Sequence, residues 1–157
     1  SVCDWSSDVC SSDLWQFVLD PPDEVVGAVR RGLVAHNIAR ARIDRAETLA
    51  WLLRDDAGTL RGGIVGEVWG ACAEIDLLWL DESLRGRGLG RDLLQRFERS
   101  ARERGARLAV VDTFDFQAPD FYRTHGYEQF SQIEGYPDGH RKLYFRKPLG
   151  DAPSCAS

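Results

Sequence analysis

Residues 15–149 show two spacings of apolar positions, which predict strands interleaved with helices. Short runs rich in β-branched and aromatic residues indicate strands, and apolar residues three and four positions apart indicate helices. The predicted strands are residues 15–19, 48–53, 59–69, 74–80, 108–112, 127–133 and 141–146. The predicted helices are residues 22–37, 89–104 and 119–125. Residues 55–80 predict an antiparallel meander, in which Gly62-Gly63 indicates a bulge or a close backbone approach. The order of elements predicts one α/β domain around a mixed sheet.

The first 14 residues differ from the rest of the chain, because they are rich in Ser, Asp and Cys and contain no basic residue. The run Asp4–Leu14, DWSSDVCSSDL, resembles the in-frame translation of a common sequencing-adapter oligonucleotide. The alternative is a native linker rich in Ser and Asp. We expect residues 1–14 to be a non-native segment, residues 15–149 to be the domain, and residues 150–157 to be a frayed tail.

Composition excludes several classes of protein. The chain carries 20 basic and 25 acidic residues, and its formal net charge is −5. Leaving out residues 1–14 removes three Asp and no basic residue, so the charge becomes −2. Neither value suggests a nucleic-acid binder, and no apolar run approaches the ~18–20 residues that cross a bilayer. No Cys/His cluster has metal-ligand spacing. Only Cys72 and Cys155 remain after residue 14, which favours reduced thiols in a cytoplasmic enzyme.

A glycine-rich turn lies between the predicted strand 74–80 and the predicted helix 89–104. Glycines leave room for an anion at the first N–H groups of a helix, and arginines add charge-assisted hydrogen bonds to phosphate. The candidate anion-binding residues are Arg85, Gly86, Arg87, Gly88, Leu89, Gly90 and Arg91. Their spacing fits neither a Walker loop nor the dinucleotide-binding fingerprint. The turn therefore predicts a phosphate site of another type.

The turn matches the signature Arg/Gln-x-x-Gly-x-Gly/Ala, with which the GNAT family of N-acetyltransferases binds the pyrophosphate of acetyl-CoA. The segment PDFYRTHGY, residues 119–127, resembles the second signature of that family. The resemblance extends over Gln16–Leu149. It implies a GNAT-like acyl-CoA N-acyltransferase fold, with a central mixed, mostly antiparallel sheet of six to seven strands flanked by helices. It also implies acetyl-CoA as co-substrate and no metal.

The implied reaction is acetyl transfer to a primary amine of a small molecule or a peptide, by direct attack in a ternary complex. The alternative is a coenzyme A-binding regulatory or interaction module that has lost catalysis. The resemblance implies neither a nucleic-acid partner nor a membrane, and it allows for a homodimer. Retention of a signature tyrosine and of acids on strand 74–80 favours the enzyme.

The resemblance assigns roles to particular residues. It implies that Tyr122 is the acid that protonates the leaving thiolate, and the alternative is a tyrosine of the core. It places the pantetheine arm along the main chain of Leu78, Trp79 and Leu80, where strand 74–80 splays from strand 108–112. The alternative is that these three residues only pack in the core.

The general base has two candidates, Glu74 and Asp76. Strict alternation would place both on one face of their strand, together with Leu78 and Leu80. An acid beside an apolar cleft can have the raised pKa that suits a base. The alternatives are a chain of waters, or acids that are salt-bridged at the surface.

One residue departs from the family pattern. Asp115 stands seven residues before Tyr122, where many members have an Asn that bonds the pantetheine arm. An aspartate can accept but not donate a hydrogen bond there, so Thr113 or Gln117 is a candidate to replace it. His140 lies in a hairpin loop that often lines the acceptor pocket in this fold.

Overall fold

The computed structural model describes residues 15–41 and 46–150. The chain divides into two compact units, residues 1–44 and 45–157, which are described separately below. The predicted adapter-derived segment 1–14, and the predicted tail apart from Gly150, lie outside the described residues. None of the helices within the described ranges is long and apolar enough to cross a membrane.

Within residues 15–41, the described part of the first unit, there is one helix, α1 (Asp23–Ala41). Pro22 precedes it, and the carbonyl of Pro22 accepts a hydrogen bond from the N–H of Val25 at 2.9 Å. Asp23 and Glu24 lie in the first turn, where the helix dipole favours acidic side chains. The prediction of a strand at residues 15–19 is wrong, because these residues form no regular structure. An aromatic, β-branched run becomes a strand only where a partner backbone takes up its hydrogen bonds.

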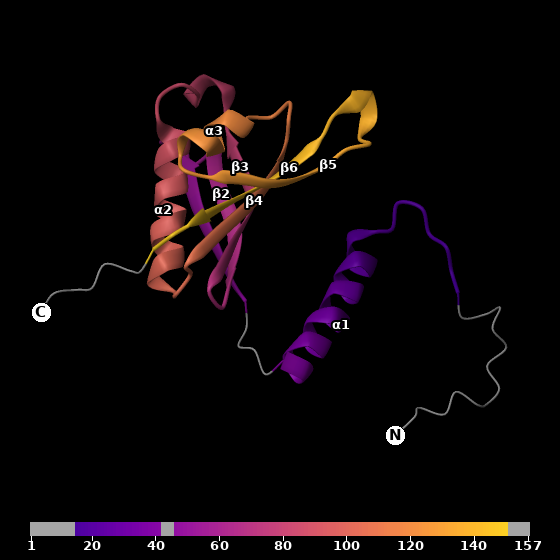
Figure 1. Ribbon diagram of the computed structural model, residues 1–157. Coiled ribbons are helices and arrows are strands. Elements are labelled where there is room, and N and C mark those ends of the chain that lie inside the picture. Colours follow the sequence, from indigo (N-terminus) through magenta and orange to yellow (C-terminus); the bar gives the residue numbers. More distant parts are fainter. Residues whose placement is uncertain (1–14, 42–45, 151–157) are drawn as a thin grey trace, which may run out of the picture. The chain divides into compact units, whose positions relative to one another are not determined.

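The second unit is a sheet flanked by two α-helices (Figure 1). Its strands are β1 (Glu47–Arg54), β2 (Leu60–Trp69), β3 (Cys72–Leu80), β4 (Leu108–Phe114), β5 (Glu128–Ile133) and β6 (Lys142–Pro148). Its helices are α2 (Leu89–Glu103), α3 (Pro119–Thr124) and the short 3-10 turns Glu82–Leu84 and Pro137–Gly139. The order in the sheet is β1-β2-β3-β4-β6-β5. Among these six described strands, only β3 and β4 pair in parallel. The predicted mixed, mostly antiparallel sheet is thus confirmed.

The core lies on the face of the sheet that α2 and α3 cover. One row of paired residues crosses four strands, from Gly66 through Ile75 and Val111 to Phe145, and all four are buried. A Cβ on Gly66 would lie 2.7 Å from the ring of Phe97 in α2. The absent side chain therefore lets α2 pack closely against the sheet.

A β-bulge interrupts β3 at Asp76. Val65 pairs with Leu77 and Gly66 pairs with Ile75, so that Asp76 is one extra residue of β3 relative to β2. One extra residue in a strand reverses which side chains point to which face beyond it. The burial pattern agrees, because Asp76 and Leu77 are exposed in succession.

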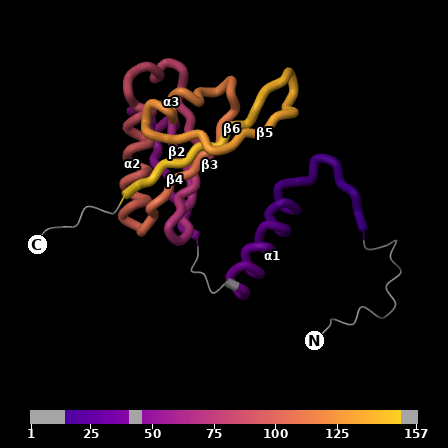
Figure 2. The backbone as a smooth tube through the Cα atoms, viewed as in Figure 1, coloured from indigo at the N-terminus to yellow at the C-terminus, as the bar shows by residue number. Residues whose placement is uncertain are grey.

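The hairpin of β5 and β6, coloured orange to yellow, reaches beyond the other strands of the sheet in both backbone views (Figures 1 and 2). Asp115, which follows β4, is hydrogen-bonded to the residue before β6, since its N–H donates to the carbonyl of Arg141 at 3.0 Å. The residues that follow β4 therefore lie against the residues that precede β6.

Candidate active site

The two parallel strands separate partway along their length. Their pairing runs from Cys72 and Leu108 to Ile75 and Val111, whereas β3 continues to Leu80 and β4 to Phe114. The splay predicted beside strand 108–112 is confirmed. Backbone N–H and C=O groups that do not pair across such a gap can bind an extended ligand.

The glycine-rich turn follows β3 and leads into α2, as the sequence predicts. Gly86 and Gly88 have φ angles of +72° and +80°, a left-handed conformation that glycine adopts without steric cost. Gly88 is the N-cap of α2. The Nε of Arg85 donates to the carbonyl of Leu80 at 3.2 Å, which ties the turn to the end of β3.

The turn fits an anionic group. A Cβ on Gly86 would meet no atom within 4 Å, so the space above it is open. The first backbone N–H groups of α2, from Leu89 to Arg91, have no partners within the helix. Arg87 and Arg91 are exposed beside them, and their guanidinium groups can bind phosphate in a bidentate manner. These donors suit a pyrophosphate.

Tyr122 lies in α3 and is buried, with 7% of its surface exposed. Its ring packs edge-on against Phe121 and Tyr127, and against Phe145 at 6.0 Å between centroids. Burial, and then the negative charge of Asp112, raise the pKa of Tyr122 to about 12. The phenol is therefore protonated throughout the neutral range, as a proton donor must be.

Asp112 and Lys142 form an ion pair at the splay that the sequence did not reveal. The Nζ of Lys142 lies 2.7 Å from Oδ2 of Asp112, and this hydrogen bond raises the pKa of Lys142. Asp112 follows Val111 directly, so it is the first residue of β4 without a partner on β3. The only sequence signal was an acid at the end of an otherwise apolar strand.

Glu74 does not share a face with Leu78 and Leu80, contrary to the expectation from strict alternation. Leu78 and Leu80 pack against the core, whereas Glu74 is exposed and points to the other face. The bulge at Asp76 is the reason, because it shifts the alternation by one residue. Asp76 itself is exposed and occupies the bulge.

Glu74 lies one row before the end of the β3–β4 pairing. Its partner on β4 is Val110, and the next pair, Ile75 and Val111, is the last. Asp112 is on the same face as Val110, two residues further along β4. The two carboxylates of Glu74 and Asp112 therefore lie beside the start of the splay, on the face opposite Tyr122.

Leu78, Trp79 and Leu80 form the β3 edge of the splay. Their backbones pair with β2 on one side, at Ile64, Gly63 and Gly62. No β4 residue pairs with them on the other side. Gly62 makes the predicted close approach, since a Cβ there would lie 2.9 Å from the carbonyl oxygen of Trp79.

Asp115 is bound to the β5–β6 connection. Its Oδ1 lies 2.9 Å from Nδ1 of His140, and its Oδ2 accepts from the N–H of Arg141 at 3.2 Å. Desolvation acts to raise the pKa of Asp115, but these hydrogen bonds outweigh it and hold the pKa below its usual value. Thr113 and Gln117 are bonded to each other at 2.9 Å.

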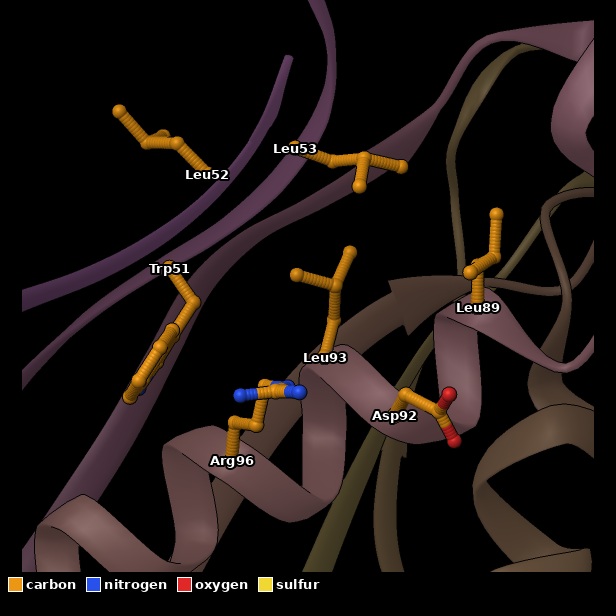
Figure 3. Close-up of a pocket in the computed structure, with 7 residues that line it drawn as sticks. All are labelled: Trp51, Leu52, Leu53, Leu89, Asp92, Leu93 and Arg96. Carbon is orange, nitrogen blue, oxygen red and sulfur yellow. The ribbon is translucent and has the colours of Figure 1, made fainter. Parts of the chain in front are cut away.

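A shallow groove of about 280 Å³ runs between β1 and α2. Figure 3 shows its lining residues, which are Trp51, Leu52, Leu53, Leu89, Asp92, Leu93 and Arg96. The guanidinium of Arg96 lies 5.2 Å from the ring of Trp51. The groove touches the glycine-rich turn only through Leu89, and β2 and β3 separate β1 from the splay.

A buried carboxylate in α2 has a structural role. Glu98 is 3% exposed, and both its oxygens accept from Nζ of Lys147 in β6 at 2.8 Å. The hydroxyl of Tyr127 also donates to it, at 3.0 Å, and burial together with Glu98 raises the pKa of Tyr127. In the part of the chain that the structure describes, no three His, Cys, Asp or Glu side chains are grouped to hold a metal.

Comparison with known proteins gives consistent results. The sequence profile of the acetyltransferase (GNAT) family matches residues 12–127. Acetyltransferase Atu2258 of Agrobacterium fabrum is 30% identical over 79% of this chain and 90% of its own length. A protein from Agrobacterium tumefaciens has a crystal structure that aligns with a TM-score of 0.76 at 29% identity, over 85% of this chain and 99% of that one.

Blasticidin-S acetyltransferase of Streptomyces morookaense is 46% identical over 85 residues, which are 54% of this chain. That alignment spans 62% of the blasticidin-S acetyltransferase, which is less than two thirds of its length. The family match covers most of the chain and includes both the glycine-rich turn and the segment with Tyr122. The chain therefore belongs to the acetyltransferase (GNAT) family.

Proposed function

We propose that this protein is an acetyl-CoA-dependent N-acetyltransferase that acts on a primary amine of a small molecule. The observation that carries the proposal is the splay between β3 and β4, with the glycine-rich turn at the end of β3 and buried Tyr122 on the helix-covered face. The family match and the acetyltransferases among its relatives support it.

In this proposal the co-substrate supplies an activated thioester, and the residues of this chain bind and orient it. Arg85, Arg87 and Arg91, with the N–H groups of the turn, hold its pyrophosphate. The main chain of Leu78, Trp79 and Leu80 bonds its pantetheine arm. Such positioning is the main contribution of the protein to a transfer between two bound substrates.

The transfer needs one bond to form, one bond to break and two protons to move, one to the leaving sulfur and one from the attacking nitrogen. The neutral amine attacks the thioester carbonyl, so that a C–N bond forms and the C–S bond breaks. The hydroxyl of Tyr122 donates a proton to the leaving thiolate, and solvent then reprotonates the phenolate. The ammonium proton passes to Glu74 or Asp76, or to a water that one of them orients.

The acceptor in this proposal is a small cationic amine. One relative is named for blasticidin-S, which supports a small-molecule amine rather than a protein amine. Acids on the face opposite Tyr122 favour a cationic acceptor. The proposal also includes a cytoplasmic location and a homodimer, the latter testable by light scattering.

The test is release of free thiol from acetyl-CoA in the presence of a panel of primary amines, which includes blasticidin S and N-terminal peptides. We expect release with small-molecule amines, and we expect mass spectrometry to show one added acetyl group per amine. Tight binding of acetyl-CoA with no release across the panel would contradict the proposal and would favour a coenzyme A-binding module.

A further inference from the structure

Aromatic rings gather where β4 ends, next to the splay. Phe114 stacks on Phe116 with centroids 5.2 Å apart and planes at 11°. Tyr136 meets Phe114 edge-on at 4.8 Å, and His140 meets Phe116 at 4.7 Å. These four rings, here called the aromatic cluster, come from β4, from the segment after it and from the β5–β6 connection.

The cluster is held in place yet open to solvent. Asp115 fixes the two sides to each other through His140 and Arg141. Phe116 nevertheless has 60% of its surface exposed. Exposure of a large apolar ring to water is unfavourable. A ring that is both fixed and exposed is therefore typical of a surface on which a ligand stacks.

The position of the cluster relative to Asp112 defines the distance between the amine and the ring of an acceptor that would fit both. Asp112 and Phe114 lie on the same face of β4. Val111, which precedes Asp112, and Thr113, which lies between Asp112 and Phe114, are buried on the other face. Residues two apart along a strand are separated by about 7 Å. An amine beside Asp112 at the start of the splay would thus have the cluster about 7 Å away.

We propose that the aromatic cluster selects acceptors whose primary amine is joined by a short chain to a flat aromatic ring. The ring stacks at Phe116 while the ammonium group lies beside Asp112, which Lys142 holds at the splay. This inference rests on the proposed function. It adds the chemical class of the acceptor.

The test compares two amines that differ only in the flatness of the ring, 3-phenylpropylamine and 3-cyclohexylpropylamine. We expect kcat/KM for the phenyl compound to be about five- to tenfold higher, as a stacking contact provides. The variant Phe116→Leu keeps an apolar side chain but removes the ring, and we expect it to lose this preference. Tyr136→Leu is a second variant with the same expectation.

Phe130→Leu is the matched control, because Phe130 is an exposed ring on β5 that contacts Tyr144 and Arg146 and lies outside the cluster. We expect it to keep the preference, and thermal melts to show all variants folded. Equal kcat/KM for the two amines, or a preference that persists in Phe116→Leu, would overturn the inference. Binding of acetyl-CoA without transfer to either amine, or to any other amine, would instead count against the proposed function.

Discussion

Ile75 and Val111 form the last pair between β3 and β4, and both strands continue beyond it without pairing to each other. The pair is buried in the row that α2 and α3 cover. The groups assigned to the proposed reaction are arranged along the splay that begins at this pair: Tyr122 on the covered face, Glu74 and Asp112 on the other face, and the glycine-rich turn beyond the end of β3. The end of one ladder of hydrogen bonds thus defines the candidate site.

Replacing Tyr122 with Phe removes the proposed proton donor but keeps the buried ring. We expect turnover to fall at least tenfold, within the range for loss of a general acid, while the affinity for acetyl-CoA stays nearly unchanged. Steady-state kinetics and calorimetry measure the two quantities. Unchanged turnover would remove Tyr122 from the mechanism and leave it a core residue.

The same variant has a consequence for stability at high pH. The pKa of Tyr122 is raised to about 12 in the folded protein, against about 10 in an unfolded chain. Unfolding therefore releases a proton above pH 10, and the free energy of unfolding falls between pH 10 and 12. We expect urea titrations to show a smaller fall in Tyr122→Phe than in the wild type. Parallel curves would contradict the raised pKa.

Substitutions at Glu74 and Asp76 distinguish the two candidate bases. Glu74 lies one row before the splay, whereas Asp76 occupies the bulge. We expect Glu74→Gln to lower kcat at least tenfold and to remove the acidic limb of the pH–rate profile. Asp76→Asn serves as the matched control and should retain that limb. The reverse result would make Asp76 the base, and retention of the limb in both would indicate a water chain.

Alanine substitutions at Gly88 and at Gly90 of the turn should have different effects on acetyl-CoA binding. Gly88 has a φ of +80°, which costs a residue with a Cβ about 1–2 kcal/mol. A Cβ on Gly90 would meet Phe121 and Leu80 at ordinary contact distances of 3.4 and 3.5 Å. We expect Gly88→Ala to weaken acetyl-CoA binding in calorimetry and Gly90→Ala to leave it within about threefold. Equal affinity in both variants would contradict the role of the left-handed turn.

Removing Lys147 alone should destabilise the fold more than replacing both Lys147 and its partner Glu98. Lys147→Met leaves the Glu98 carboxylate buried without a countercharge, which costs about 3–5 kcal/mol. The double variant with Glu98→Gln avoids that charge, so we expect it to unfold at a higher urea concentration than the single one. If the double variant were the less stable, the pair would not be coupled as the 2.8 Å contacts indicate.

Sequence patterns predicted the elements of the second unit closely, because these segments carry strong local signals. Strand 74–80 is observed as β3, and helix 89–104 as α2. The strand predicted at residues 15–19 is wrong, because its apolar residues say nothing about whether a partner strand is present. The glycine-rich turn was identifiable because its glycines have a local conformational requirement.

By itself the sequence determined the family signatures, the mixed sheet and the residues of the glycine-rich turn, since each depends on neighbours along the chain. Only the tertiary structure decided which face each acid of β3 occupies, because the bulge at Asp76 depends on pairing with β2. It also brought Asp112 to Lys142 and Asp115 to His140. These contacts join residues about 25 to 30 positions apart, and no local spacing encodes such contacts, because they depend on how strands pair in space.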